Sequence, residues 1–476
     1  MRSETQRLAS FAANLRYKDL RPTVRHQSIR LIYDALGCAV SGFRSHSTEV
    51  FNSVVLGLGG MRQATAIPSG YKSSAPHAAF LNAMSANAQD LDDNLLYHCH
   101  IGNTVIAGAA AIGELLDSSG KDLITAVAAG YEVAGRVSLS MPGVLAVDRK
   151  SKRVISTNPL GFGYNTIGAA VAAGRLLRLN EKEMAHALGI AAYSVPIPSV
   201  ARSISGDRFT TAKTGMYGWQ AWAGCMAALF AAQGVGGDDR VLEGPGAFWK
   251  MNGAPWVDMG VLTEKLGTKW WLMDVSFKLE AAGTWMRPAL QALRVLLDKY
   301  EIGADEIQRI EARVHPLGKG KIFHQTIPKS YLDAQVSYHY LLAATALRIP
   351  NEKWQLPRVY KGTAIRKMIK RVQVLPDRMS TRELQRELAV RPHRATGSLT
   401  TIKVYARGKE FVERTKYGLG DPQDPGTRAS DSDLDAKFAR FAAPVLGRKA
   451  TRVPEIVWAL DRRTSTRELV RAMCRA

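Results

Sequence analysis

Apolar residues in the first 270 positions recur at helical spacing. Ile29, Ile32, Leu36 and Val40 follow one another at intervals of three or four residues, and Gly42 stands two residues after the last of them. This interval places side chains on one face of an α-helix, so the pattern predicts a helix that ends near the glycine. Further predicted helices are rich in alanine and cover residues 107–116, 126–137, 167–177, 181–192 and 220–233. Alanine favours helix, and small side chains let neighbouring helices approach closely.

The pattern changes after about residue 270. Ile307–Val314 mixes apolar and polar residues in near alternation, which is typical of a half-buried strand. Residues 372–375 form a second short strand candidate, and residues 399–415 contain two β-rich runs joined at Arg407-Gly408, which predicts a hairpin. Apolar residues at helical spacing predict helices at 286–297 and 337–347, and again from Asp431 to the end of the chain.

These patterns predict a mostly α protein with a smaller α+β domain. We expect a large all-helical domain at residues 1–270, an α+β lid domain at 271–415, and C-terminal helices at 416–476 that return to the helical domain. Hydrophobic residues make up 46% of the chain and charged residues 22%, which is ordinary for a globular protein and excludes a disordered or fibrous one.

The sequence offers no targeting or membrane signal that we recognise. Its N-terminus lacks an uninterrupted apolar stretch, and no segment reaches about 18 consecutive apolar residues. The four cysteines are scattered, which fits a reducing compartment better than a disulfide framework. We therefore expect a cytoplasmic protein with no membrane partner.

The formal net charge of +22 indicates either a nucleic-acid binder or a protein that attracts anionic metabolites. Nucleic-acid binders usually concentrate lysine and arginine in one patch or arm. Here the basic residues are spread along the chain among acidic ones, so the sequence favours a small anionic substrate and no nucleic-acid partner.

Most generic catalytic motifs are missing. The chain has no GxxxxGK[ST], HExxH or GxSxG pattern and no complete dinucleotide fingerprint. His98-Cys99-His100 resembles a fragment of a metal site, but no second ligand cluster accompanies it, so we expect no metal and no cofactor. Asp90 lies ten residues before His100, and carboxylates beside histidine suit acid–base chemistry. A helix cap followed by a solvated acidic turn explains the same residues equally well.

Several short motifs, taken in order, resemble the MmgE/PrpD family. Residues 32–38 (IYDALGC), 130–133 (GYEV), 168–179 and 417–425 (YGLGDPQDP) look like landmarks of that family, and the ordered set covers roughly residues 5–450. The family also carries a segment like AxDFDDT followed by His-Pro-Ser, whose active-site positions match Asp90, Asn94 and His100.

Three more positions follow from the resemblance. Lys213 matches the family's active-site lysine, Lys278 matches the lysine that opens the second domain, and Tyr340 matches its active-site tyrosine. The resemblance implies catalytic roles for Asp90, His100, Tyr340 and Lys213, and substrate binding by Lys278, Asn94 and Lys213. Two ammonium groups suit the charge of a carboxylic acid.

The sequence also departs from the family pattern. Two family histidines correspond to Pro159 and to the segment around Gly283, which contains no imidazole. Asn94 replaces the usual threonine, and Ile101-Gly102 replaces Pro-Ser. These changes put the substrate and the exact reaction in question, but not the fold.

The resemblance implies a homodimer with a pocket between its two domains, and a cofactor-independent lyase that eliminates water or carbon dioxide from a small carboxylic acid. An isomerase or epimerase of such an acid is the alternative enzyme class, since it also needs proton removal. A non-catalytic binding protein is a third reading, made plausible by the missing histidines.

Overall fold

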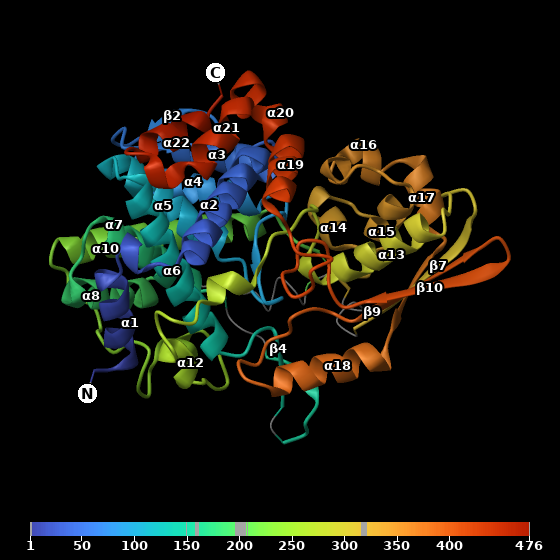
Figure 1. Ribbon diagram of the computed structural model, residues 1–476, viewed down its shortest axis with the longest axis horizontal. Helices are drawn as coiled ribbons and strands as arrows, with labels where there is room; N and C mark the ends of the chain where they lie inside the picture. Colours follow the sequence, from blue (N-terminus) through green and yellow to red (C-terminus); the bar gives the residue numbers. More distant parts are fainter. Residues whose placement is uncertain are drawn as a thin grey trace.

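The computed structural model describes residues 2–148, 150–157, 161–195, 206, 208–315 and 321–475. Its first 270 residues are mainly helical (Figure 1). The long helices are α1 (Glu4–Asn14), α2 (Pro22–Gly42), α3 (His46–Gly57), α4 (Ala75–Asn87), α5 (Gly102–Leu116), α6 (Gly120–Ser140), α7 (Tyr164–Leu176), α8 (Glu181–Tyr193) and α10 (Ala212–Ala232), followed by the short α11 (Phe248–Met251) and α12 (Gly260–Thr263). All five Ala-rich segments and the apolar stripe ending at Gly42 lie in these helices.

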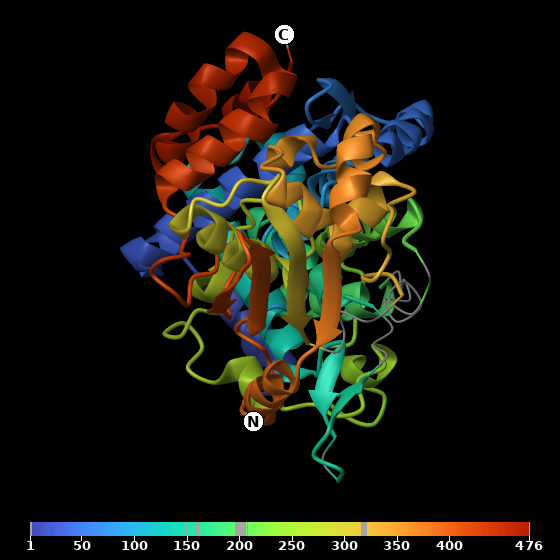
Figure 2. The same ribbon diagram turned by 90° about the vertical axis from the view of Figure 1, so that its right-hand side faces the viewer.

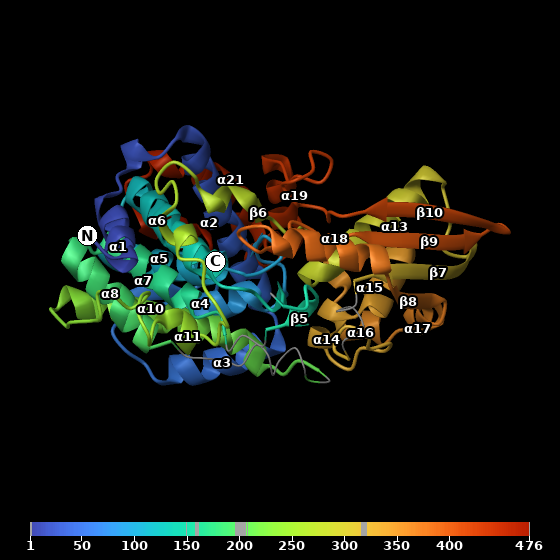
Figure 3. The same cartoon turned by 90° about the horizontal axis from the view of Figure 1, so that it is seen from below.

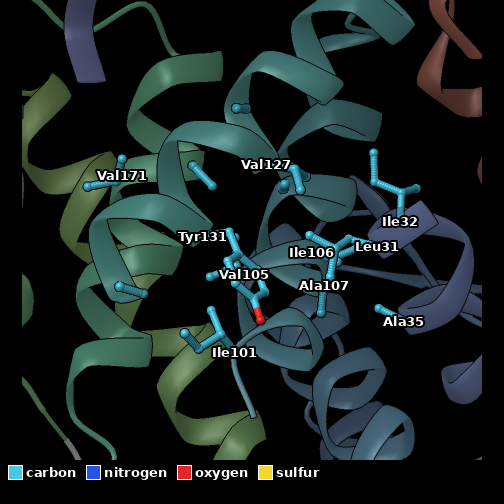
Figure 4. Close-up of a cluster of buried hydrophobic side chains, with 14 of the residues drawn as sticks. Leu31, Ile32, Ala35, Ile101, Val105, Ile106, Ala107, Val127, Tyr131 and Val171 are labelled. Carbon is cyan, nitrogen blue, oxygen red and sulfur yellow. The ribbon is translucent and has the colours of Figure 1, made fainter. Parts of the chain in front are cut away.

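Small residues let the central helices pack closely. A methyl group at Gly130 of α6 would lie 2.6 Å from the Gly168 carbonyl oxygen of α7, and one at Gly42 would lie 1.9 Å from the Ser85 carbonyl oxygen of α4. Figure 4 shows the core formed between these helices, where Val105, Val127 and other apolar side chains meet. A larger side chain at either glycine would force the helix backbones apart.

Three short antiparallel pairings accompany the helices, and the sequence pattern did not predict them. They join β1 (Ala64–Ala66) to β2 (Tyr71–Ser73), β3 (Asn94–Leu95) to β6 (Val275–Ser276), and β4 (Leu145–Val147) to β5 (Val154–Ser156). Strands of two or three residues are too short to show an alternating pattern. The β3–β6 pairing matters for the site, because it fixes residues about 180 positions apart in register, Asn94 opposite Ser276.

The second part of the chain contains a four-stranded mixed sheet in the order β10-β9-β7-β8 (Figure 2). β7 (Ile307–Val314) runs antiparallel to β9 (Thr400–Ala406) and parallel to β8 (Val372–Pro376). β9 continues into β10 (Lys409–Thr415) through Arg407 and Gly408, which both have positive φ, as a two-residue hairpin turn requires. The predicted strands and hairpin are therefore confirmed. Figure 3 shows the hairpin extending away from the helical part.

Helices cover this sheet and link it to the rest. α13 (Arg287–Lys299) packs on β9 and β10, and α15 (Tyr338–Ala346) packs on α13 and β8. The remaining helices of this part are α14 (Tyr331–Val336), α16 (Pro357–Tyr360), α17 (Thr363–Ile369) and α18 (Arg378–Ala389). The buried side chains of residues 282–406 form a core separate from the core of the helical part.

The C-terminal segment lies against the beginning of the chain, red beside blue in Figure 1. Its helices are α19 (Asp431–Phe441), α20 (Ala443–Leu446), α21 (Val453–Trp458) and α22 (Thr466–Ala472). α19 packs on α2, where Lys437 and Asp34 form a buried ion pair at 2.5 Å. The predicted fold class, mostly α with a smaller α+β part, is confirmed. The domain boundaries at residues 270 and 415 stay a prediction.

Among the described residues, no helix combines the length and the apolar character that crossing a bilayer requires. The apolar stretch 221–232 lies within α10, whose core-facing side chains pack against α4 and α7.

Candidate active site

The loop between α4 and β3 carries three buried carboxylates. Asp90 has a φ of 53°, a left-handed conformation that aspartate tolerates better than most residues. Asp92 accepts hydrogen bonds from the side chains of Asn87 and Asn103, at 3.0 and 2.6 Å. Asp93 is 1% exposed. The acidic segment is therefore folded into the protein, and the alternative of a solvated turn is wrong.

Asp93 fixes the start of α5. Its Oδ1 accepts from the backbone N–H of Gly102 at 2.9 Å, and its Oδ2 accepts from the Tyr131 hydroxyl at 2.7 Å. A side chain at Gly102 would lie 2.3 Å from Oδ1. Gly102, where the family pattern has serine, leaves room for the Asp93 carboxylate to reach the N-terminus of α5.

Two lysines from distant segments meet at the Asp90 carboxylate. Lys213, in the first turn of α10, places its Nζ 3.0 Å from Oδ2 of Asp90. Lys278 follows β6, and its Nζ lies 2.5 Å from Oδ1 and 2.5 Å from the Asp90 backbone oxygen. The β3–β6 ladder brings Lys278 here, because Asp90 lies just before β3. The structure thus brings both lysines to one carboxylate beside His100, although of the two only Lys213 lines the cavity there.

The two ammonium groups decide the charge of Asp90. Burial alone raises the pKa of this carboxyl group, but Lys213, Lys278 and His100 together hold its pKa well below its usual range. Asp90 is therefore ionised across the physiological range and locks both lysines in place. Lys278 is fully buried, whereas the side chain of Lys213 is 11% exposed. Only Lys213 of the two reaches open space.

His100 lies beside this cluster with its ring partly exposed. Its Nδ1 is 3.2 Å from Oδ2 of Asp92, and its Nε2 is 3.9 Å from Oδ1 of Asp90. The Nδ1 contact has the length of a hydrogen bond, but the two atoms do not form one in this geometry. Burial raises the pKa of Asp92, but the charge and close polar contact of His100 together with the charge of Lys278 outweigh burial, so the net shift is downward. An ionised carboxylate at Nδ1 favours the tautomer whose Nε2 can accept a proton.

A cavity of about 140 Å³ opens in front of His100 and Lys213. It lies between the helical part and the α+β part, since both contribute to its walls. The lining residues are Asp90, Asn94, Tyr97, His98, His100, Val144, Phe162, Phe209, Lys213, Met216, Tyr217, Gly283, Thr284, Trp285, Met286, Phe323 and Val336. A concave site with a few convergent polar groups between domains is the usual place for a small-molecule ligand.

The second histidine of the cavity, His98, has a different character. Its Nε2 lies 3.4 Å from both the Tyr164 hydroxyl and Nη2 of Arg394. Burial, the guanidinium group of Arg394 and His100 hold the pKa of His98 well below its usual range. His98 is therefore neutral near pH 7 and cannot serve as a general acid there.

Asp90, Asp92 and His100 have the right atom types for a cation site, with their ligand atoms within 4.8 Å of one another. However, the two oxygens of Asp90 already bind ammonium groups at 2.5 and 3.0 Å. A divalent cation would have to displace two lysines and meet their repulsion. Cys99, the other candidate ligand, is buried with its thiol 3.4 Å from Ser138 Oγ. These residues therefore fit a metal poorly.

The other two predicted site residues, Asn94 and Tyr340, differ in whether they line the cavity. Asn94 lines the cavity and donates to the Cys99 carbonyl oxygen at 3.2 Å. Tyr340 does not line it: its ring is buried in the core of the α+β part, and its hydroxyl donates to the backbone oxygen of Trp354. The hydroxyl is thus already bonded within the core, and we leave Tyr340 out of the proposed chemistry.

Sequence reasoning missed the amides that hold Lys213. Gln335 Oε1 lies 3.4 Å from the lysine Nζ, and its amide nitrogen donates to the Ala88 backbone oxygen and to Gln355. The only sequence signal was that Gln335 stands five residues before Tyr340, the tyrosine that matches the family. The first family-histidine position, Pro159, lies outside the described residues, and the second, Gly283, lies at the cavity wall.

A buried carboxylate that fixes two cations lies beside an imidazole, at a cavity between two structural parts, and such an arrangement is suited to a small anion. Comparison with known protein families places both parts of the chain in one family. The MmgE/PrpD N-terminal domain matches residues 6–254, and the MmgE/PrpD C-terminal domain matches residues 281–462. The chain belongs to the MmgE/PrpD family.

Individual relatives are distant. The chain is 27% identical over 312 residues to a cis-aconitate decarboxylase of Aspergillus terreus, a match that covers 62% of this chain and 60% of the relative. A protein of the same name from Aspergillus terreus strain NIH 2624 / FGSC A1156 matches to the same extent. The match thus spans less than two thirds of these relatives' length, and their activity is not carried over on similarity alone.

Proposed function

We propose that the protein is a cofactor-independent lyase that acts on a small carboxylic acid by proton transfer at the carbon next to a carboxylate. The observation that carries the proposal is the convergence of Lys213, Lys278 and His100 on Asp90 at one wall of a cavity. Membership of the MmgE/PrpD family and the similarity to cis-aconitate decarboxylases support this class of reaction.

Each group has a part in this chemistry. Lys213 binds the substrate carboxylate, because its ammonium group borders the cavity. Lys278 holds Asp90, and Asp90 in turn fixes the position of Lys213. For loss of water, Nε2 of His100 takes the proton from the carbon next to the carboxylate, the electron pair left behind forms the double bond, and the hydroxyl group on the adjoining carbon leaves as water with the proton that the imidazolium returns. For loss of carbon dioxide, the bond to the departing carboxylate breaks, its electron pair stays on the carbon, and that carbon takes a proton from the His100 imidazolium. Asp92 stabilises the imidazolium that results.

An isomerase or epimerase is the alternative that uses the same residues. It needs one proton removed and returned, and no leaving group. His100 is the one partly exposed imidazole beside the lysine cluster in the described part of the chain, which suits a single proton transfer as well as an elimination.

Product analysis in deuterated water separates these possibilities. The protein is incubated with candidate acids, and substrate and product are examined by mass spectrometry and NMR. Loss of water or carbon dioxide supports the lyase. Deuterium in recovered substrate without loss of mass supports the isomerase. Neither change, for any acid that binds, would contradict both and leave a binding protein.

A further inference from the structure

The walls of the cavity are mostly aromatic and apolar. The side chains of this kind are Tyr97, Val144, Phe162, Phe209, Met216, Tyr217, Trp285, Met286, Phe323 and Val336. They come from both parts of the chain and contact one another: the rings of Phe162 and Tyr217 stack with centroids 6.5 Å apart, and those of Tyr97 and Trp285 meet edge to face at 5.6 Å. Such walls bind apolar surface, and they stabilise charge poorly.

Positive charge in the cavity is scarce. Among the described residues that line it, Lys213 is the single cation, and it already contacts Asp90 at 3.0 Å and the ring of Phe209 at 4.8 Å. Lys278 is sealed behind Asp90 with no exposed surface. His98 is held neutral by burial, which depresses its pKa. The described walls therefore provide for one carboxylate, and further carboxylates would be desolvated without a partner.

The lining residues 283–286, all within the part of the chain that the structure describes, carry no charged side chain. Gly283 contributes backbone alone, and a methyl group there would touch the sulfur of Met286 at 3.1 Å and Val336 at 3.2 Å. The volume of about 140 Å³ is close to that of a cavity that holds one benzene ring. The space in front of Lys213 thus has the size and the polarity of an aromatic ring or a branched apolar group.

We propose that the substrate is a carboxylic acid with an aromatic or branched apolar body, in place of a compact polycarboxylate. The inference rests on the proposed function for the carboxylate, and it adds the chemistry of the rest of the substrate. The carboxylate lies at Lys213 with its neighbouring carbon facing His100, and the apolar body contacts Phe162, Tyr217 and Trp285.

Two probes that differ in one group test this inference. Benzylsuccinate and tricarballylate are both succinate with one added substituent, a benzyl group in the first and a carboxymethyl group in the second. Binding to the full-length protein is measured by isothermal titration calorimetry. We expect benzylsuccinate to bind at least about tenfold more tightly, because burying a phenyl group is favourable by more than one factor of ten in affinity. Equal or tighter binding of tricarballylate overturns the inference, because the two probes share the same two carboxylates of succinate and differ only in the added group.

A charge added to the cavity wall sharpens the test. Met216 lies one helical turn after Lys213 and lines the cavity. Met216→Lys places a second ammonium group there, and we expect it to shift the affinity ratio of the two probes toward tricarballylate by about tenfold or more. Met61→Lys is the matched control, since Met61 is 73% exposed and does not line the cavity. An unchanged ratio in Met216→Lys contradicts the inference.

The outcome separates this inference from the proposed function, because binding and turnover are measured independently. Preferential binding of benzylsuccinate, with no turnover or deuterium exchange of any candidate acid that binds, would refute the lyase and the isomerase and leave the ligand class standing. Turnover of a compact tricarboxylate at a normal rate would refute the proposed ligand class and leave the proposed enzyme activity standing. Lys213→Met confirms the location of the probe, since it should weaken benzylsuccinate binding by at least about tenfold.

Discussion

The ammonium group of Lys278 lies 2.5 Å from the Asp90 carboxylate and 2.5 Å from the backbone oxygen of the same residue. Lys278 is fully buried, and Asp90 is 5% exposed. The ion pair therefore joins the start of the second part of the chain to the acidic loop of the first. It also stabilises the left-handed backbone of Asp90, on which the position of Lys213 depends.

Removing Lys278 should destabilise the protein strongly. Lys278→Met leaves the buried Asp90 carboxylate with one lysine less, and breaking a buried pair typically costs about 3–5 kcal/mol. The free energy of unfolding is measured in urea. Lys403→Met is the matched control, because Lys403 pairs with Glu410 at 2.9 Å on the surface, where such a pair contributes less than about 1 kcal/mol. Equal effects of the two substitutions would show that the Lys278 pair is not structural.

Lys213 should act on substrate binding more than on stability. Its side chain borders the cavity, so Lys213→Met removes the partner of the substrate carboxylate, a charged hydrogen bond that contributes about 1.5–3 kcal/mol. We expect KM to rise by at least about tenfold with a smaller change in kcat. Lys329→Met, at an exposed lysine outside the cavity, serves as the control. A change confined to kcat would contradict the anchoring role.

Asp93 predicts a pH dependence of stability. Burial and the charge of Asp92 raise the pKa of this carboxyl group to about 7, against about 3.9 in the unfolded chain. Between these values the folded protein holds a proton that the unfolded chain has released, so this group lowers stability as pH rises from about 4 to about 7. Above about pH 7 the loss is complete.

The test is Asp93→Asn, which cannot titrate. The stability of the variant relative to the natural protein should increase from pH 5 to pH 8 in urea unfolding experiments. Asp298→Asn, at a carboxylate whose side chain is 60% exposed, should show no such trend. A variant whose relative stability is constant or falls over this range would refute the assignment of the raised pKa to Asp93.

The protein should be a poor cis-aconitate decarboxylase, although its relatives bear that name. That reaction binds three carboxylates, expels one as carbon dioxide and protonates the remaining carbanion. The described cavity walls offer one cation, and Gly283 supplies no side chain where the family often has a histidine. Loss of one acid–base group typically costs about 10²–10⁴-fold in rate. We expect turnover far below the usual range of about 1–10³ per second, with the Aspergillus terreus enzyme as positive control.

The fold was predictable where the pattern was long. The Ala-rich segment 220–233 and the apolar stripe of α2 have many residues facing one core, and the alternation in Ile307–Val314 continues for a whole strand. The β3–β6 pairing was not predictable, because it involves two residues on each side and depends on packing between distant segments. That pairing is what brings Lys278 to Asp90.

The charged residues of the site could be predicted from the sequence, but the apolar residues that line the cavity could not. Asp90, His100, Lys213 and Lys278 belong to motifs that chemistry or family resemblance selects. Trp285 and the other aromatic cavity residues look like core residues in a sequence, since nothing in their spacing reveals that one ring face is left open. Tyr340, the tyrosine that matches the family, has its hydroxyl bonded within the core, so its catalytic role stays a prediction.

Deuterium exchange that depends on His100 tests the central claim most directly. The protein is incubated in deuterated water with succinate, benzylsuccinate and tricarballylate, and the hydrogens next to the carboxylates are followed by NMR. We predict deuterium exchange on at least one acid, reduced about 10²–10⁴-fold in His100→Gln and unchanged in His26→Gln, at an exposed histidine outside the cavity. Exchange at the same rate in His100→Gln, or none in the natural protein with an acid that binds, would contradict proton transfer by His100.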